Sequence, residues 1–469
     1  MRTVTLEPGR RLTQADLNRT GGALPAEVVA SAEKIVDEVR ARGDQAVREF
    51  CQCFDGACPD AFRVPDELLA GAAELVDPAF LAALTRAANQ IRSFHERELE
   101  RSWFTTRPDG TLLGVQVTPV SSAAVYVPGG RAQYPSTVLM DTIPAKVAGV
   151  GRVVMLTPPQ ADGTLSAYTL AAAALAGVDE VYAVGGAQAI AAAAYGTESI
   201  PAVDKIVGPG NAYVAAAKRY VSGDVGIDMV AGPSEVCVLA DATADPVVVA
   251  ADLMAQAEHD PLASCYLVTC DPDLPARVLD AVGRLVAQSP REEITRASLD
   301  DRGVVVVADT LEAAVDAVNV VAPEHLELHC ADALGLVGKI RNAGAIFVGA
   351  WSSEPLGDYV AGPNHTLPTG GTARFSNPLG VYDFQKRSSV ICYTPEGLLA
   401  DAPSVQTLAQ SEGLWAHALS VGLRRRLAES GRERYDDLAG ACEGAHRVAW
   451  PEDLSAPGAA YLPGFEGRA

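Results

Sequence analysis

The sequence predicts an α/β protein with two doubly wound, mostly parallel sheet domains, each an incomplete Rossmann-like unit, and a small helical C-terminal tail domain. From Val153, short apolar runs alternate with helical segments, and a second such run starts at Glu235. After Asp383 the alternation gives way to helices. Short apolar strands that alternate with helices form parallel sheets covered on both faces. A chain of 469 residues, 48% of them hydrophobic, can build more than one core.

The N-terminal part is predicted to be helical over residues 25–55 and 65–100. In the second segment, apolar residues recur at helical spacing from Leu68 to Val76. Pro78 interrupts this pattern, and Asp77 before it is a good N-cap. We therefore expect a new helix to begin at Pro78.

Two successive strand and helix runs define the predicted sheets. The first has strands VVMLTP, VYAVGG and KIVGPG, with helices at 164–176, AQAIAAAAYG and AYVAAAKRYV. The second has strands EVCVLAD, CYLVTC, GVVVVAD, HLELHC and AIFVGAW, with helices at 246–259, 274–288, 310–320 and 331–342. The second run is longer, and its sheet is expected to be the larger one.

The domain boundaries follow from these runs. We predict an N-terminal arm at 1–24, a larger α/β domain from 25–125 and 234–380, and a second α/β domain at 126–233. The tail at 381–435 contains the strand SSVICYT and helices at 404–411 and 414–430. Residues 436–469 are rich in Pro and Gly without periodicity, and we expect a flexible extension there.

Charge and composition exclude several classes of partner. The formal net charge of -22 disfavours nucleic acid and anionic membranes, because both would repel the chain. The N-terminus has no apolar core of a secretory signal, and the longest apolar stretch, 181–195, is too short to span a bilayer. Nine cysteines without a CxxC pair are typical of a reducing compartment, so a cytoplasmic location is expected.

The histidines are few and lie in polar clusters. Of the seven, His259, His325, His365 and His417 each follow or precede polar residues in a short motif. Asp358 lies in a further cluster in the same half of the chain. Histidine is the commonest metal ligand and the commonest general base near neutral pH. The pattern favours one assembled metal or acid–base site.

Individual pairs suggest roles but leave structural explanations open. Gln256 and His259 lie three apart at a helix end and share one face, where an amide oxygen and an imidazole suit zinc. Such a pair is also common as a plain helix end. Asp358 follows the strand AIFVGAW, and ligand sites in α/β sheets form beyond the carboxyl ends of strands. A simple turn residue is the alternative.

Two further pairs are candidates for acid–base chemistry. Glu324 and His325 are adjacent and diverge in direction, so they would act on a substrate as two separate groups. A surface Glu beside a capping His is the alternative. Glu412 and His417 lie five apart, about 140° around a straight helix. They would approach a ligand from different sides, unless they are a cap and a surface His.

Three glycine-containing turns follow strand ends. The loop Gly208-Pro-Gly210-Asn211 can present backbone N–H groups to an anion or a cofactor. Gln188 follows the paired glycines of VYAVGG, and Tyr126 precedes Pro-Gly-Gly in a turn. No turn has the G-x-G-x-x-G fingerprint, so the motifs alone leave nucleotide binding as one possibility beside plain turns.

Taken together, the motifs resemble the histidinol dehydrogenases over about residues 25–430. The matching segments are YVPGG, STVLM, IPAKVAG, VGGAQAIAA, DKIVGPGNAYV, DMVAGPSEV, ADLMAQAEHDP, APEHLEL, GDYVAGPNHTLPT and DFQKR. Members of that family oxidise L-histidinol to L-histidine through an aldehyde in two NAD-dependent steps, the last steps of histidine biosynthesis. The resemblance implies the same reaction here, with NAD and one Zn²⁺ per subunit.

The resemblance also implies roles for particular residues. It assigns the zinc ligands Gln256, His259, Asp358 and His417, the acid–base pair Glu324 and His325, further substrate contacts Ser234, His365 and Glu412, and the NAD contacts Tyr126, Gln188 and Asn211. The zinc ligands and the acid–base pair would also contact substrate. The zinc site would then lie in the larger domain and the NAD site in 126–233.

In the family, the segment that carries Glu412 and His417 comes from the partner subunit. The resemblance therefore implies a homodimer with shared sites and a dimer-swapped tail. Alternatives remain: an NAD-dependent dehydrogenase of another polar alcohol on the same scaffold, a zinc hydrolase, and a metal-binding scaffold without activity. The extension at 436–469 goes beyond the usual family length, and no catalytic role is assigned to it.

Overall fold

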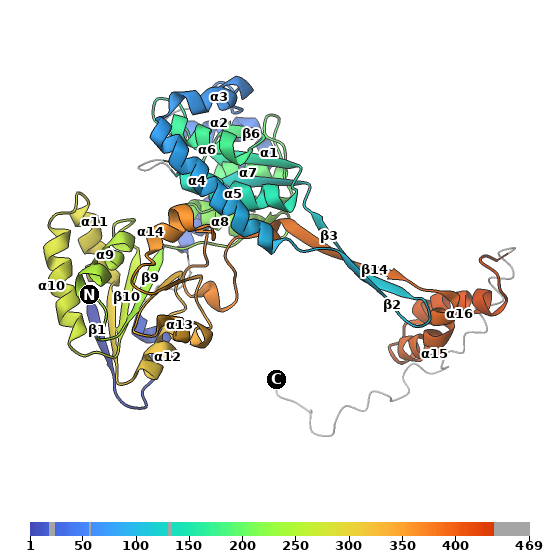
Figure 1. Cartoon of the computed structure of the whole chain (residues 1–469). Helices are drawn as coiled ribbons and strands as arrows, with labels where there is room; N and C mark the ends of the chain where they lie inside the picture. The colour runs from blue at the N-terminus through green and yellow to red at the C-terminus, as the bar shows by residue number, and fades with distance from the viewer. Residues whose placement is uncertain (18–23, 56–57, 130–133, 436–469) are drawn as a thin grey trace. The chain divides into compact units, whose positions relative to one another are not determined.

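The α/β architecture is confirmed by the computed structural model (Figure 1), which describes residues 1–17, 24–55, 58–129 and 134–435. The chain divides into two compact units. Unit 1 contains Met1–Leu99 and Pro119–Lys386, and unit 2 contains Glu100–Thr118 and the chain from Arg387. The predicted extension at 436–469 and residues 18–23 of the predicted arm lie outside the described residues.

The first sheet of unit 1 has five parallel strands in the order β6-β5-β4-β7-β8. The strands are β4 (Ser122–Tyr126), β5 (Arg152–Thr157), β6 (Glu180–Ala183), β7 (Lys205–Val207) and β8 (Gly226–Ile227). One face is covered by α5 (Pro135–Ala148) and α6 (Ala167–Ala176), and the other by α7 (Gly186–Tyr195) and α8 (Ala212–Val221). The strand order changes direction beside β4, where doubly wound sheets bind ligands.

The N-terminal helices complete the two layers of this five-stranded sheet. Helices α1 (Ala26–Arg42) and α2 (Asp44–Phe54) share a core with α7 and α8, and α4 (Pro78–His95) shares one with α5 and α6. The short α3 (Asp66–Gly71) lies beside α6. The domain prediction grouped residues 25–125 with 234–380, whereas these helices bury their apolar faces against the other sheet. Periodicity shows that a helix has an apolar face but not which sheet will cover it.

Local signals placed the helix boundaries well. The Asp77 carboxylate accepts the backbone N–H of Ala79 at 2.6 Å, so the predicted N-cap before Pro78 is confirmed. The predicted helix over 25–55 is broken at Gly43, which has φ +55°. That positive φ is easy for glycine alone, and it lets the chain turn between α1 and α2.

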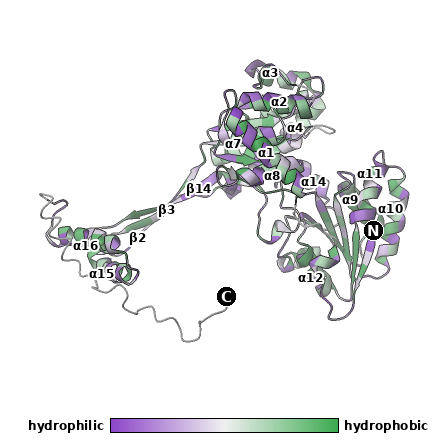
Figure 2. Cartoon of the chain, turned by 180° about the vertical axis from the view of Figure 1, so that it is seen from behind, coloured by the Kyte–Doolittle hydropathy of each residue, from purple (hydrophilic) through white to green (hydrophobic). Residues whose placement is uncertain are grey.

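The second sheet has six parallel strands in the order β1-β11-β10-β9-β12-β13. The strands are β1 (Arg2–Leu6), β9 (Glu235–Ala240), β10 (Ser264–Thr269), β11 (Val304–Ala308), β12 (His325–His329) and β13 (Ala345–Val348). Helices α9 (Pro246–Ala257), α10 (Leu274–Val286) and α11 (Glu292–Arg302) cover one face, and α12 (Leu311–Val321) and α13 (Ala333–Leu336) the other (Figure 1). Figure 2 shows hydrophobic residues along these strands.

Two elements of this sheet were not expected. Residues 2–6, predicted as part of an arm, form the edge strand β1, with Val4 opposite Val306. Helix α11 was not predicted, because its apolar residues are too few to give a periodic signal: only Thr295, Ser298 and Leu299 are buried. The predicted helix over 331–342 is reduced to α13 and a following 3₁₀ turn.

Unit 2 combines a three-stranded sheet with two helices. Its sheet has the order β14-β3-β2, from β2 (Trp103–Thr106), β3 (Leu112–Pro119) and β14 (Gln385–Cys392). Helices α15 (Pro395–Ser411) and α16 (Trp415–Glu429) confirm the predicted helical tail, although α15 begins nine residues before the predicted 404. Thr394 accepts the N–H of Gly397 and caps that earlier start.

Within the described ranges, no single helix has the length and apolarity needed to cross a bilayer. The pair Asp66–Leu75 and Pro78–Glu98 reaches that length and apolarity only as two pieces joined at a bend of 112°.

A buried carboxyl group in α5 makes the stability of unit 1 dependent on pH. Asp141 is fully buried, and its Oδ1 accepts the Thr366 hydroxyl at 2.8 Å. Burial raises the pKa of Asp141 to about 8. Between about pH 4, its ordinary pKa in the unfolded chain, and pH 8, the folded protein holds a proton that the unfolded chain has lost. Stability should therefore fall as pH rises through this window.

The variant Asp141→Asn keeps an acceptor for Thr366 and cannot ionise. We expect its melting temperature, relative to the wild type, to rise steadily from pH 5 to pH 8. The difference in free energy of unfolding between the variant and the wild type should grow by up to roughly 1.4 kcal/mol per pH unit. Thermal unfolding of both proteins at several pH values checks this. A difference that stays constant with pH would mean that Asp141 is already ionised in the folded state.

Candidate functional site

A large cavity lies at the carboxyl ends of the five-stranded sheet. It has a volume of about 940 Å³, and Tyr126, Gln188 and Asn211 all line it. Tyr126 ends β4, Gln188 lies in the first turn of α7 after β6, and Asn211 caps α8 after β7. The three residues that the sequence selected for a nucleotide are thus gathered around one cavity, next to the reversal of strand order.

Some polar atoms of this cavity already make hydrogen bonds within the protein, and others are left for a ligand. The Tyr126 hydroxyl accepts the N–H of Gly186 at 3.0 Å, and burial raises its pKa to about 12, so it keeps its proton and can donate it to a ligand. Asn211 Oδ1 accepts the N–H groups of Tyr213 and Val214, which leaves its amide N–H₂ group for other partners. Both amide atoms of Gln188 are buried without a hydrogen-bond partner in the described ranges.

Gly208 fixes the shape of the loop before α8. It has φ +110°, and a Cβ atom there would collide with the carbonyl oxygen of Tyr126. The buried Lys218 donates to the Gly208 carbonyl at 2.8 Å and pairs with Asp228. Only glycine allows this close approach of the loop to the end of β4.

The sequence reasoning missed two residues of this cavity. Phe54 and Asp55, at the end of α2, also line it. Burial raises the pKa of Asp55, and its Oδ2 has no hydrogen-bond partner among residues with described positions. The only signal in the sequence was an exposed aromatic next to an acid at a helix end, which is too common to select.

The candidate metal and acid–base residues meet around the first residue of β12. His325 Nδ1 lies 3.2 Å from the carbonyl oxygen of Glu235, and its Nε2 lies 3.5 Å from Asp358 Oδ1. Since a carbonyl can only accept, the Nδ1 atom carries the hydrogen. In neutral His325 the buried Nε2 is therefore the free basic atom, and it has no other partner within the part of the chain described.

Glu324, the residue before β12, is held by the same residue of β9 as His325. Its Oε2 accepts the backbone N–H of Glu235 at 2.8 Å and lies 3.7 Å from His325 Nδ1. Burial raises the pKa of Glu324 to about 8. The pKa of His325 is also raised, to about 10, because the carboxylates of Glu324, Asp358 and Glu354 outweigh the effect of burial, which lowers it. Glu324 can therefore exchange a proton near neutral pH, whereas His325 holds its proton until the negative charge around it is offset.

Gln256 and His259 come to this region from the end of α9. Gln256 is buried, and its Oε1 has no hydrogen-bond partner in the described segments. His259 lies just beyond the helix and is exposed, with its backbone N–H bonded to the Gln256 carbonyl. Loss of solvent around the imidazole lowers the pKa of His259 and outweighs the opposing effects of Asp358 and Glu258, so the neutral form that binds metals is favoured.

The expectation that Asp358 marks the carboxyl end of the sheet is wrong. His325 is the first residue of β12 and lies opposite Ala345, the first residue of β13, so the cluster lies at the amino ends of these strands. After β13 the chain returns through the short helix α14 (Glu354–Leu356) into a π-helical turn, Gly357–Ala361, that carries Asp358. Ligand sites are expected beyond the carboxyl ends of strands, but here the segment of α14 and Gly357–Ala361 carries Asp358 back to the amino ends.

His365 supports Asp358 rather than facing it directly. Its Nδ1 lies 3.0 Å from the Asp358 carbonyl, and its Nε2 lies 3.2 Å from the Thr137 hydroxyl of α5. Burial lowers the pKa of His365, so it stays neutral. For Asp358, burial raises the pKa, but His325, His365 and His259 outweigh this and keep it below its ordinary value.

Ser234 precedes Glu235, whose backbone holds both Glu324 and His325. The Ser234 carbonyl accepts the N–H of Ser264 at 3.0 Å. Two residues before Ser234, the Gly232 N–H donates to the Thr369 hydroxyl at 2.6 Å. Ser234 is therefore next in the chain to the atoms that fix the acid–base pair. Neither Glu235 nor Glu354, which acts on His325 electrostatically, was singled out from the sequence.

Glu412 and His417 belong to unit 2, whereas the other candidates belong to unit 1. Glu412 ends α15 and His417 lies in the first turn of α16, and both are exposed. Around them unit 2 also exposes large apolar side chains: Ile391, Val405, Leu408, Leu414 and Trp415. Among its described residues, the buried hydrophobic cluster of unit 2 consists of Ala409 and Ala418, with Leu419 packed against them.

The donors in unit 1 fit a zinc ion. They are the unpartnered Gln256 Oε1, the exposed His259 imidazole and the ionised Asp358 carboxylate, and the last two act on each other electrostatically. Oxygen and nitrogen donors of this kind suit zinc, which prefers four ligands. Three ligands from unit 1 leave a place for one more.

Comparisons with known proteins identify the family of this chain. The model of the histidinol dehydrogenase family matches residues 20–425. A histidinol dehydrogenase of Bacillus licheniformis is 52% identical over 88% of this chain and 97% of its own length, and one of Bacillus subtilis is 51% identical over 91% and 99%. The crystal structure of histidinol dehydrogenase from Elizabethkingia anophelis has a TM-score of 0.86 at 34% identity, and covers 92% of this chain and 99% of its own.

Proposed function

Because this chain belongs to the histidinol dehydrogenase family, an oxidoreductase family of histidine biosynthesis, we propose that it oxidises L-histidinol to L-histidine through L-histidinaldehyde, in two NAD-dependent steps at a zinc site. The observation that carries the proposal is the free Nε2 of His325, fixed by the Glu235 carbonyl beside Glu324 and Asp358. NAD serves as the hydride acceptor, and zinc supplies positive charge that binds the nitrogen atoms of histidinol.

In the first step, His325 accepts the proton of the substrate hydroxyl through Nε2 while hydride leaves the adjacent carbon. The products are the aldehyde, NADH and one proton. The hydrogen bond from Nδ1 to Glu235 fixes the tautomer, so the imidazole needs no reorientation. Gln256, His259 and Asp358 would hold the zinc ion and contact the substrate. Ser234 and His365 would make further substrate contacts.

In the second step, one water adds to the aldehyde and a second hydride leaves, which yields the carboxylate, NADH and two protons. Glu324, buried beside His325, positions or activates the water. His325 accepts a proton again after returning the first to solvent. A reactive aldehyde must stay bound between the steps, and a closed pocket prevents its loss.

Tyr126, Gln188 and Asn211 are proposed to bind NAD. Their support is the 940 Å³ cavity and the hydrogen-bonding groups that remain free in it. A cytoplasmic location is proposed as well, since the free thiols of the described cysteines suit a reducing compartment.

We further propose a homodimer in which Glu412 and His417 complete the partner's site, with His417 as the fourth zinc ligand. The exposed apolar side chains of unit 2 and its minimal core support a second chain as their cover. Nucleic acid and membranes are not proposed as partners, given the charge of -22.

The test is the count of NADH formed per histidinol. With limiting L-histidinol, excess NAD⁺ and zinc-loaded protein, we expect two NADH per substrate, and a chelator should abolish the reaction. One NADH would mean that the reaction stops at the aldehyde and that Glu324 does not serve the second step. No NADH would favour a different polar alcohol as the substrate.

A further inference from the structure

A second cluster of metal-type side chains lies beyond the proposed active site. Asp252 precedes Gln256 by four residues on α9, so the two share a helix face. Glu327 and His329 follow His325 at intervals of two along β12, so all three point to the same side of the sheet. The cluster Asp252, Glu327 and His329 therefore lies on the same helix and the same strand as Gln256 and His325. Asp252 is one turn before Gln256 on α9, and Glu327 and His329 come after His325 on β12.

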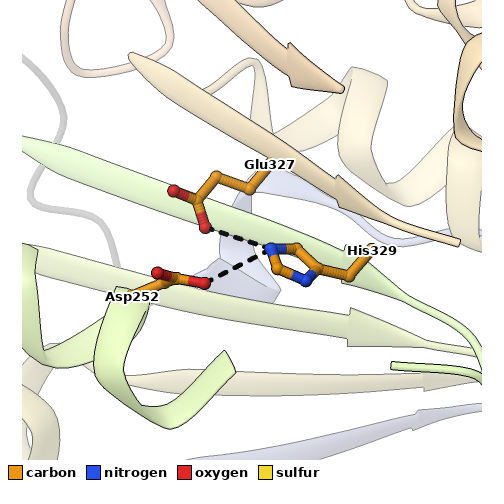
Figure 3. A group of neighbouring side chains, drawn as sticks. All are labelled: Asp252, Glu327 and His329. Carbon is orange, nitrogen blue, oxygen red and sulfur yellow. Dashed lines mark ion pairs between the residues drawn. The ribbon is translucent and has the colours of Figure 1, made fainter. Parts of the chain in front are cut away.

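The three side chains point at one another (Figure 3). His329 Nε2 lies 3.3 Å from Asp252 Oδ2 and 3.5 Å from Glu327 Oε2. The residues are 5%, 7% and 0% exposed, respectively. Apart from these ion pairs with one another, none of the three atoms has a hydrogen-bond partner in the described ranges, so three buried polar atoms face one point.

The remaining contacts hold the cluster in this orientation. Glu327 Oε1 accepts the backbone N–H of Glu354 at 2.8 Å, which directs Oε2 toward His329. Asp252 lies on α9, and His329 is the last residue of β12, opposite Ala240 of β9. Regular secondary structure thus carries all three side chains.

The distances fit metal ligands better than ion pairs. Charge-assisted hydrogen bonds between nitrogen and carboxylate oxygen are about 2.7–2.9 Å long. Ligand atoms about 2.0–2.1 Å from a tetrahedral zinc ion are separated by about 3.4 Å. The measured separations of 3.3 and 3.5 Å match the second value.

The charges of the cluster are two carboxylates and one imidazole, and Asp252 and Glu327 raise the pKa of His329 to about 9 against the effect of burial. The groups that act electrostatically on nearby Glu354 are His325 and the carboxylates of Asp358, Glu327 and Asp252, so acids outnumber the basic partner. Burial raises the pKa of Glu354 to about 7, with the three carboxylates adding to the effect. A buried excess of carboxylates is costly, and a divalent cation offsets it.

We propose that Asp252, Glu327 and His329 bind a second divalent metal ion of the zinc type, separate from the ion of the proposed active site. This ion ties the end of α9 to β12 and so braces the two elements that carry Gln256, His259 and His325. Its function is structural, because no candidate substrate-binding residue belongs to its ligand set.

Metal analysis of purified variants tests this assignment. After equilibration with micromolar zinc and removal of free metal, we expect two zinc per subunit in the wild type, one in His259→Asn, one in His329→Gln, and none in the double variant. Zinc should raise the melting temperature of His259→Asn but not that of the double variant. A matched control is His95→Gln in the His259→Asn background, since His95 is also buried and paired with a carboxylate, Glu98. This control should keep one zinc.

The assignment is overturned if the wild type holds a single zinc that His259→Asn removes. In that case His329 is an imidazolium that closes an ion triad with Asp252 and Glu327. If His329→Gln does not fold, a zinc-edge anomalous map of wild-type crystals decides, with a peak at His329 Nε2 expected and its absence contrary. Failure of the proposed function is distinct, since it would appear as full activity in a His259→Asn protein.

Discussion

The variant His325→Gln should lose alcohol oxidation by a factor of about 10²–10⁴, the usual contribution of a positioned general base. The fold should be unaffected, because a glutamine N–H can replace Nδ1–H toward the Glu235 carbonyl. What the variant loses is the free Nε2 beside Asp358. Steady-state NADH formation from histidinol, at saturating NAD⁺, measures the effect.

Two further readings separate a chemical role from a structural one. Zinc content and oligomeric state of His325→Gln should equal those of the wild type, and the loss should appear in kcat more than in KM. A wild-type rate would refute the role of His325 as base. An equal loss in His95→Gln, a buried histidine of α4, would show that the assay reports folding instead.

The sequence predicted the sheets well because their strands are simple apolar runs. Runs such as VVMLTP and EVCVLAD are buried on both faces in the structure, as parallel strands should be. Strand β1 was not predicted, because only Val4 and Leu6 of its five residues are buried, as expected at a sheet edge. The α1 and α4 helices were predicted, but which sheet they cover depends on tertiary packing, about which their periodicity carries no information.

For the site, sequence motifs selected the right neighbours and missed how they are held. Tyr126, Gln188 and Asn211 line one cavity, and Asp358 Oδ1 lies 3.5 Å from His325 Nε2, while the roles that the resemblance implied for them stay predictions. The backbone of Glu235, which fixes both members of the acid–base pair, has no signature in its side chain. The cluster at His329 was not seen either, because Asp252 is 77 residues away in sequence and only the packing of α9 on the sheet unites them.

Mixing two inactive variants should restore activity if the sites are shared between subunits. His325→Gln damages unit 1 and His417→Asn damages unit 2. In a heterodimer of the two, one site combines an intact unit 1 with an intact unit 2, and the other site contains both defects. With one intact site of two in each heterodimer, we expect about half of wild-type activity from the pure heterodimer. Co-expression with two different tags and NADH formation by the doubly purified dimer measure it.

The control for this experiment uses two defects in the same unit. His325→Gln mixed with His259→Asn leaves every site with a damaged unit 1, so no activity should return whichever way the sites are built from two chains. Recovery with His417→Asn but not with His259→Asn would establish exchange of unit 2 between subunits. No recovery in either mixture would place His417 in the site of its own chain. The exposed apolar side chains near it, Leu414 and Trp415, would then need a cover other than a partner's active-site region.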